Sequence, residues 1–134
     1  MRVILAGACV TAVTWMTMTP VLAHHSFSAE FDINKPVKLT GKVTSMRWSN
    51  PHAWIYIDVQ DSAGKVVNWA FETTTANTLY RRGWRQDDLQ AGTTIAIEGW
   101  LARNGTPTAN AGSVTLPDGR RLFAGSAGPN DATP

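Results

Sequence analysis

Three histidines are the residues of this sequence best suited to holding a metal ion. His24 and His25 stand side by side, and His52 follows within the segment at residues 48–54. If the chain is cleaved after Ala23, the α-amine and ring nitrogen of His24 can chelate one ion, and His52 can supply a third nitrogen. His25 offers a competing chelate through the amine, a deprotonated amide and its ring. Because nitrogen donors in a plane favour Cu(II), the sequence predicts a copper site made of His24, His25 and His52.

Other interpretations of these histidines stay open. His24 and His25 can be solvated residues beside a cleavage site, and His52 can cap a corner of the chain with a hydrogen bond. Zinc is disfavoured because a structural zinc site usually takes four protein ligands, and the single cysteine, Cys9, lies near the N-terminus in the predicted leader. Copper is therefore the one cofactor that the sequence suggests.

An aromatic face on two predicted strands is the alternative binding site. Trp54 and Tyr56 share one parity of the first of these strands, and Asn68 and Glu72 share one parity of the second. Aromatic rings beside an amide and a carboxylate suit a sugar or another small polar ligand. The competing interpretation is that the phenylalanines of the N-terminal segment cover these rings and complete the core.

The composition favours binding over catalysis. No carboxylate spacing indicates a general acid–base pair, and the chain has no Gly-rich phosphate loop, serine nucleophile motif or haem-attachment motif. The formal net charge is +2, and no basic run is longer than Arg81-Arg82 or Arg120-Arg121, which argues against a nucleic-acid partner. We expect the partner to be a metal ion, a small polar ligand or a protein in the periplasm. A structural accessory domain without a small ligand is a further alternative.

The N-terminal residues have the pattern of a secretory signal peptide. Arg2 precedes an apolar run, and Val21-Leu22-Ala23 is a small-residue ending typical of a cleavage site. The purely apolar part is shorter than the ~20 residues that span a bilayer. We therefore expect residues 1–23 to be removed, leaving a periplasmic or secreted bacterial protein without a membrane anchor.

The remaining sequence predicts a small all-β domain. Residues 24–36 form an N-terminal arm, residues 37–124 the domain, and residues 125–134 a disordered tail with little apolar surface. The first strand changes its apolar parity between Val43 and Met46, which is typical of a bulged, bent strand. Regular alternation predicts further strands at about residues 53–59, 67–71, 95–101 and 109–116, and a last short strand through residue 123.

One short helix interrupts the strands. Thr73, Thr74 or Thr75 can cap it, Leu79 and Tyr80 are its expected buried contacts, and the helix ends near residues 82–83. The order strand–strand–strand–helix–strand–strand is that of an OB-fold, a partly open Greek-key barrel. We therefore predict an OB-fold-like barrel of five to six strands, with an open β-sandwich as the alternative.

Five short motifs occur in order along the chain. They are His24-His25-Ser26-Phe27, Asn50-Pro51-His52-Ala53-Trp54, Val67-Asn68-Trp69-Ala70-Phe71-Glu72, Arg81-Arg82-Gly83-Trp84 and Ser113-Val114-Thr115-Leu116-Pro117-Asp118-Gly119. On these motifs the chain resembles a bacterial family of small exported proteins classed as a domain of unknown function. The resemblance implies an exported, OB-like domain and no particular activity.

Overall fold

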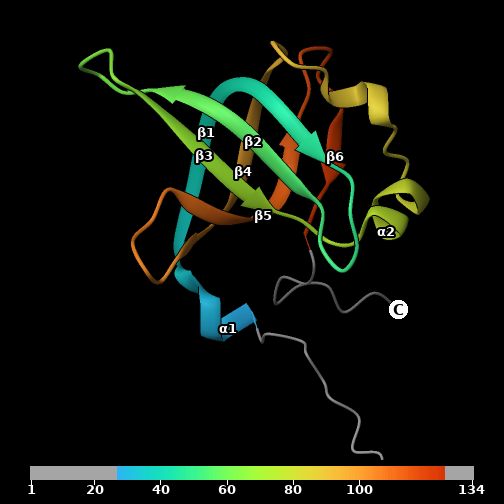
Figure 1. The fold of residues 1–134 in the computed structure, drawn as a ribbon, viewed down its shortest axis with the longest axis horizontal. Coiled ribbons are helices and arrows are strands. Elements are labelled where there is room, and N and C mark those ends of the chain that lie inside the picture. Colours follow the sequence, from blue (N-terminus) through green and yellow to red (C-terminus); the bar gives the residue numbers. More distant parts are fainter. Residues whose placement is uncertain (1–26, 126–134) are drawn as a thin grey trace, which may run out of the picture.

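Strands make up most of residues 27–125, the part of the chain that the computed structural model describes (Figure 1). In chain order the elements are α1 (Phe27–Glu30), β1 (Phe31–Arg47), β2 (Trp54–Gln60), β3 (Val66–Glu72), α2 (Ala76–Arg81), the 3-10 helix η1 (Gln86–Leu89), β4 (Thr94–Ala102), β5 (Thr108–Thr115) and β6 (Arg121–Phe123). The predicted leader, His24, His25 and residues 126–134 of the predicted tail lie outside the described residues.

The six strands form one sheet that returns on itself. The strand order is β3-β2-β1-β4-β5-β6, and β3 also pairs with β5. Five strands therefore make a ring, and β6 extends the sheet beyond β5. Only the β3–β5 pairing is parallel; the other pairings between the described strands are antiparallel. The predicted all-β fold is confirmed, and its sheet has the ring-like closure that an OB-like arrangement requires.

β1 bends so that it can serve two sides of the ring. Its first part pairs with β4, its last part pairs with β2, and the β2 register shifts between Val43 and Ser45. This shift is the bulge that the change of apolar parity predicted. Gly41 is needed nearby, because a Cβ there would lie 2.5 Å from the Asp58 carbonyl oxygen.

β1 begins earlier than the sequence predicts. It starts at Phe31 rather than Val37, so that the predicted arm at residues 24–36 is partly strand and contains α1. Phe31 is buried opposite Ala102, and the register is irregular from there to Pro36. An irregular register removes the alternation by which a strand is recognised in a sequence.

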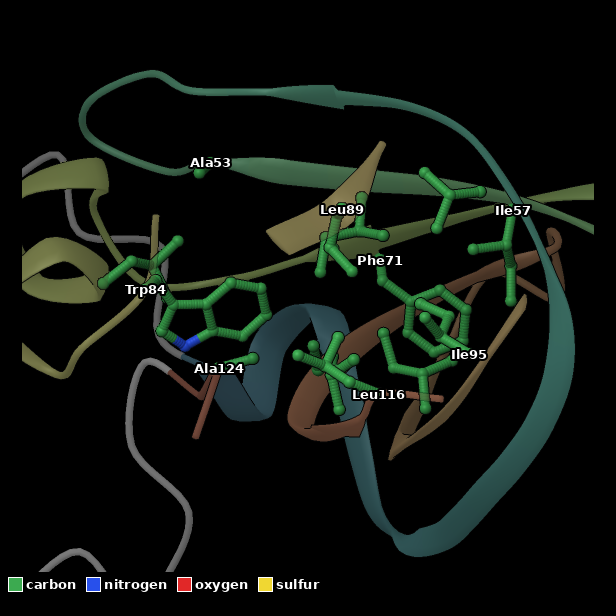
Figure 2. Packing of buried hydrophobic residues seen from close by; sticks show 14 of the residues in the cluster. Ala53, Ile57, Phe71, Trp84, Leu89, Ile95, Leu116 and Ala124 are labelled. Carbon is green, nitrogen blue, oxygen red and sulfur yellow. The ribbon is translucent and has the colours of Figure 1, made fainter. Parts of the chain in front are cut away.

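The core fills the inside of the ring. Figure 2 shows Ile57 and Ile95 toward one end of the cluster and Trp84 and Ala124 toward the other. The Trp84 indole is fully buried, and its Nε1–H donates to the Phe123 carbonyl at 2.8 Å. The loop after α2 thus closes one end of the core and is tied to β6.

α2 begins where the sequence predicts, but the burial of one of its side chains differs from the prediction. Thr75 is its N-cap, with the side-chain oxygen accepting from the Thr78 N–H at 3.1 Å, and Leu79 is fully buried. The predicted burial of Tyr80 is wrong, because its side chain is 61 % exposed. The Arg85 guanidinium covers the Tyr80 ring at 4.3 Å from its centroid, so the ring packs against a surface cation.

Candidate functional site

His52 lies at the corner that joins β1 to β2. The corner is held to the neighbouring backbone, since the Ala53 N–H donates to the Thr74 carbonyl at 3.1 Å and the Thr73 N–H donates to the Ala53 carbonyl at 2.9 Å. These bonds continue the β2–β3 pairing past the ends of both strands. His52 is therefore presented by a rigid end of the sheet.

The ring of His52 is fixed by two acceptors. Its Nδ1 lies 2.9 Å from Glu72 Oε1 and 3.0 Å from the Thr73 carbonyl oxygen. A backbone carbonyl can only accept, so Nδ1 must carry the hydrogen and donate. In the neutral ring the lone pair is then on Nε2, which makes no hydrogen bond within the described part of the chain. With 35 % of the His52 side chain exposed, this lone pair is available to a ligand.

Glu72 is the buried half of this pair. It is the last residue of β3, and only 10 % of its side chain is exposed. A carboxylate buried to this degree needs a donor, and the imidazole N–H supplies one. Glu72 therefore acts as the group that orients His52.

A hollow of about 640 Å³ opens beside this pair. His52, Trp54 and Glu72 line it from the β2–β3 side, together with Arg47 from β1 and Glu30 from α1. The Arg47 guanidinium lies 6.0 Å from the centre of the Trp54 ring. The chain that leads from the N-terminal segment into β1 thus borders the corner hollow.

The four residues of the predicted aromatic face lie on one face of the β2–β3 pair and are spread along its length. The register sets Trp54 opposite Glu72, and Tyr56 lies farther along β2. Asn68 lies opposite Asp58 near the far end of the pair, and its amide donates to Asp58 Oδ1 at 2.8 Å. Asn68 and Glu72 are four positions apart, about 13 Å along a strand. Trp54 and Glu72 line the corner hollow with His52, whereas Tyr56 and Asn68 are not among its lining residues.

The two phenylalanines of the N-terminal segment lie differently with respect to the aromatic face. The Phe27 ring contacts Phe31 at 5.6 Å and the edge of Trp100 at 5.7 Å between ring centres. Trp54 and Tyr56 are half-buried. The predicted covering role is wrong for Phe27, which packs against Trp100 of β4, whereas Phe31 borders a hollow together with Trp54 and Glu72.

The described residues do not by themselves make a three-ligand metal site. No group of three His, Cys, Asp or Glu side chains converges between Phe27 and Gly125. His24 and His25 lie outside that range. Of the three predicted histidine ligands, the structure therefore describes His52 alone. Sequence reasoning missed the contact between His52 and Glu72, although each residue was singled out separately.

Comparison with known proteins gives a family and no activity. A family model described as a family of unknown function (DUF6152) matches residues 12–111, which include the corner and its partners. No curated protein and no solved structure matches the sequence significantly. None of the helices within residues 27–125 has the length and hydropathy of a membrane span.

Proposed function

The chain belongs to the family of unknown function DUF6152, and we propose that it is an exported protein that binds copper(II) at the His52 corner. One observation carries this proposal. The His52 Nδ1–H is committed to Glu72 and to the Thr73 carbonyl, which leaves the lone pair of the neutral ring on Nε2. In this proposal Nε2 is one ligand, and His24 and His25 supply the others.

The His52–Glu72 pair has the chemistry of a supported metal ligand. Histidines that bind metals usually donate their second ring N–H to a carboxylate or a backbone carbonyl. That bond fixes the ring and its tautomer and makes the free nitrogen a better donor. His52 makes contacts of both kinds before any ion arrives.

The proposal requires the N-terminal histidines to lie at this corner. Glu30, at the end of α1, lines the same hollow as His52. Because α1 spans Phe27–Glu30, only the three steps from His24 to Phe27 can be extended, which gives a reach of about 10 Å beyond the start of α1. Cleavage of the predicted leader would expose the His24 amine, so that export and metal binding belong to the same proposal.

Copper(II) fits this donor set better than zinc. An amine and imidazole nitrogens suit a tetragonal Cu(II) site, and Cu(II) stands at the top of the divalent affinity order. Zinc would need four protein ligands for a structural site, whereas the proposed set offers three nitrogens and an open position. We assign no reaction to that position.

A Cu(II) titration of the protein beginning at His24 tests the proposal, read by calorimetry and EPR. We expect one tight equivalent with a nitrogen-rich EPR spectrum. Both an added residue before His24 and the His52→Ala variant should abolish tight binding. The Glu72→Gln variant should keep the same spectrum type and bind about 10–100-fold more weakly. Asn68→Ala, on the same strand as Glu72, is the matched control and should bind like the wild type.

Two outcomes would overturn the proposal. Loss of binding only in the extended protein would leave copper on the N-terminus alone and His52 as a structural residue. The absence of any tight equivalent would remove the metal site. It would favour the alternative, a small-ligand or protein-interaction module that uses Trp54 and its neighbours without a metal. Thermal melting of each variant separates loss of binding from loss of fold.

A further inference from the structure

A second hollow lies on the outer face of the sheet and shares no lining residue with the corner hollow. Its volume is about 480 Å³, within the ~300–1,000 Å³ typical of small-molecule sites. Strands β1, β4, β5 and β6 all contribute to it. We call it the outer groove and define it by Val37, Lys38, Glu98, Trp100, Arg121 and Phe123.

One side of the outer groove is charged. Lys38 Nζ lies 2.8 Å from Glu98 Oε1, and Arg121 Nη2 lies 2.7 Å from Glu98 Oε2. The Ser113 hydroxyl accepts from Arg121 Nε at 3.0 Å and from Nη2 at 2.9 Å. The strand register explains this meeting, because it sets Lys38 opposite Glu98 and Glu98 opposite Ser113. The guanidinium is thus held in place before a ligand binds.

This charged side has room for an anion. Lys38 and Arg121 share the single carboxylate of Glu98, so the three side chains together carry one net positive charge. Lysine has three N–H donors and arginine five, more than Glu98 and Ser113 engage. Nη1 of Arg121 makes no hydrogen bond to any residue between Phe27 and Gly125. A carboxylate or similar anion could accept from Nη1 and from Lys38 while Glu98 stays paired.

The other side of the outer groove is aromatic. The Trp100 ring lies against Gly112, where an added Cβ would meet ring atoms at 3.3 and 3.4 Å. The Phe27 ring supports Trp100 edge-on, so the indole is held at this position. Phe123 is 62 % exposed although its own backbone carbonyl is fixed by Trp84. An exposed aromatic ring on a fixed backbone, in the same groove as a half-buried indole, offers apolar contact area to a planar ligand.

We propose that the outer groove binds a small planar aromatic carboxylate. Its ring packs against Trp100 and Phe123, and its carboxylate accepts hydrogen bonds from Arg121 and Lys38. Charge complementarity selects this ligand class, because the groove combines apolar rings with one uncompensated positive charge. This site is independent of the copper proposal, since it uses none of the same residues.

The probe for this site is 2-naphthoate, titrated into the protein beginning at His24. Binding is followed by calorimetry and by ¹H–¹⁵N NMR, with the neutral 2-naphthamide as the charge control. We expect saturable binding of naphthoate, with the largest amide shifts at Gly99, Gly112 and the Trp100 indole. Naphthamide should bind at least about tenfold more weakly, because it lacks the charge-assisted hydrogen bonds.

Matched variants locate the anion. Arg121→Gln and Lys38→Gln should each weaken naphthoate binding about tenfold or more, and Phe123→Ala should weaken both probes. Arg120→Gln and Lys42→Gln remove neighbouring cations that do not line the groove and should leave the affinity unchanged.

Several outcomes would overturn the assignment. The assignment would be wrong if naphthoate and naphthamide bound with equal affinity, or if the groove and control variants changed the affinity equally. It would also be wrong if the NMR shifts clustered outside the outer groove, or if naphthoate showed no saturable binding. A dimer in sedimentation that Phe123→Ala dissociates would identify a second copy as the occupant instead.

Discussion

At the scale of single residues, two glutamates on the outer face of the sheet are held in opposite ways. Glu72 is nearly buried and contacts the His52 imidazole, whereas Glu98 is 38 % exposed and contacts the cations of Lys38 and Arg121. A buried carboxylate depends on its partner's geometry, because solvent cannot replace the hydrogen bond. An exposed one depends on pH and salt, because solvent screens its ion pairs.

The cluster of Glu98 with Lys38, Arg121 and Ser113 makes a testable contribution to the free energy of unfolding at low pH. The hydrogen bond from Lys38, with the charges of Lys38 and Arg121 and the Ser113 hydroxyl, lowers the pKa of Glu98 from its ordinary value. A lowered pKa in the folded state means that the unfolded chain binds the proton more readily. The cluster therefore stabilises the protein above the unfolded pKa, and this stability is lost as the pH falls through the folded pKa.

We therefore expect the free energy of unfolding to fall less in Glu98→Gln than in the wild type as the pH is lowered from about 5 to about 3. The difference should stay below about 1 kcal/mol, because the pair is exposed. Thermal melting at several pH values and low ionic strength measures it. Added salt should shrink the difference. Identical pH profiles for the two proteins would contradict the prediction.

At the scale of secondary-structure elements, local patterns predicted what depends on neighbours in sequence. The bulge in β1, the Thr75 cap and the inward parity of β2 were all visible, since each follows from spacing along one segment. The early start of β1 was not visible, because its first residues pair irregularly with β4. Tyr80 was misjudged because the Arg85 that covers its ring comes from the next segment.

The candidate site shows the same division. His52 was singled out because of its residue type and its expected place at a corner of the chain. Glu72 was assigned to the aromatic face, since parity gives the face of a strand but not which residues along it meet. Its contact with His52 depends on the register that puts Glu72 opposite Trp54 and on the corner just before β2. Both are properties of strand pairing that a single sequence does not contain.

The pairing of β4 with β5 should be sensitive to one glycine. A Cβ at Gly99 would lie 1.9 Å from the Asn110 carbonyl oxygen, where the register between the two strands shifts. Because that obstacle is backbone, Gly99→Ala must displace a strand, and we expect a loss of about 3 kcal/mol or more in the free energy of unfolding. Urea denaturation measures it.

Gly105 provides the control for this prediction. It lies in the turn between β4 and β5 with φ +74°, and no atom lies within 4 Å of an added Cβ. Gly105→Ala should cost only about 1–2 kcal/mol, from the left-handed backbone alone. A Gly99→Ala variant as stable as Gly105→Ala would show that the β4–β5 register can adjust.

At the scale of the whole molecule, ring closure places strands β1–β5 around one core, and β6 is attached to it at one edge. β3 pairs with both β2 and β5, and the Thr74 N–H donates to the Ala124 carbonyl at 2.9 Å. The Trp84 indole joins the helical segment to β6 in the same way. No strand of the ring can leave without opening the core, and β6 is tied to it by these hydrogen bonds, so we expect residues 27–125 to unfold in one cooperative step.

A pair of phenylalanines tests this expectation. Phe71, on β3, is fully buried between the register partners Ile55 and Ala109, whereas Phe123, on β6, is mostly exposed. Phe71→Ala should lower the free energy of unfolding by about 3–5 kcal/mol, and the milder Phe71→Leu by about 1–2 kcal/mol. Phe123→Ala should change it by less than about 0.5 kcal/mol while weakening naphthoate binding. Tryptophan fluorescence and far-ultraviolet circular dichroism in urea should give coincident transitions for every variant. Separate transitions would show that the ring consists of two units, and a large loss in Phe123→Ala would make that residue part of the fold rather than of a binding surface.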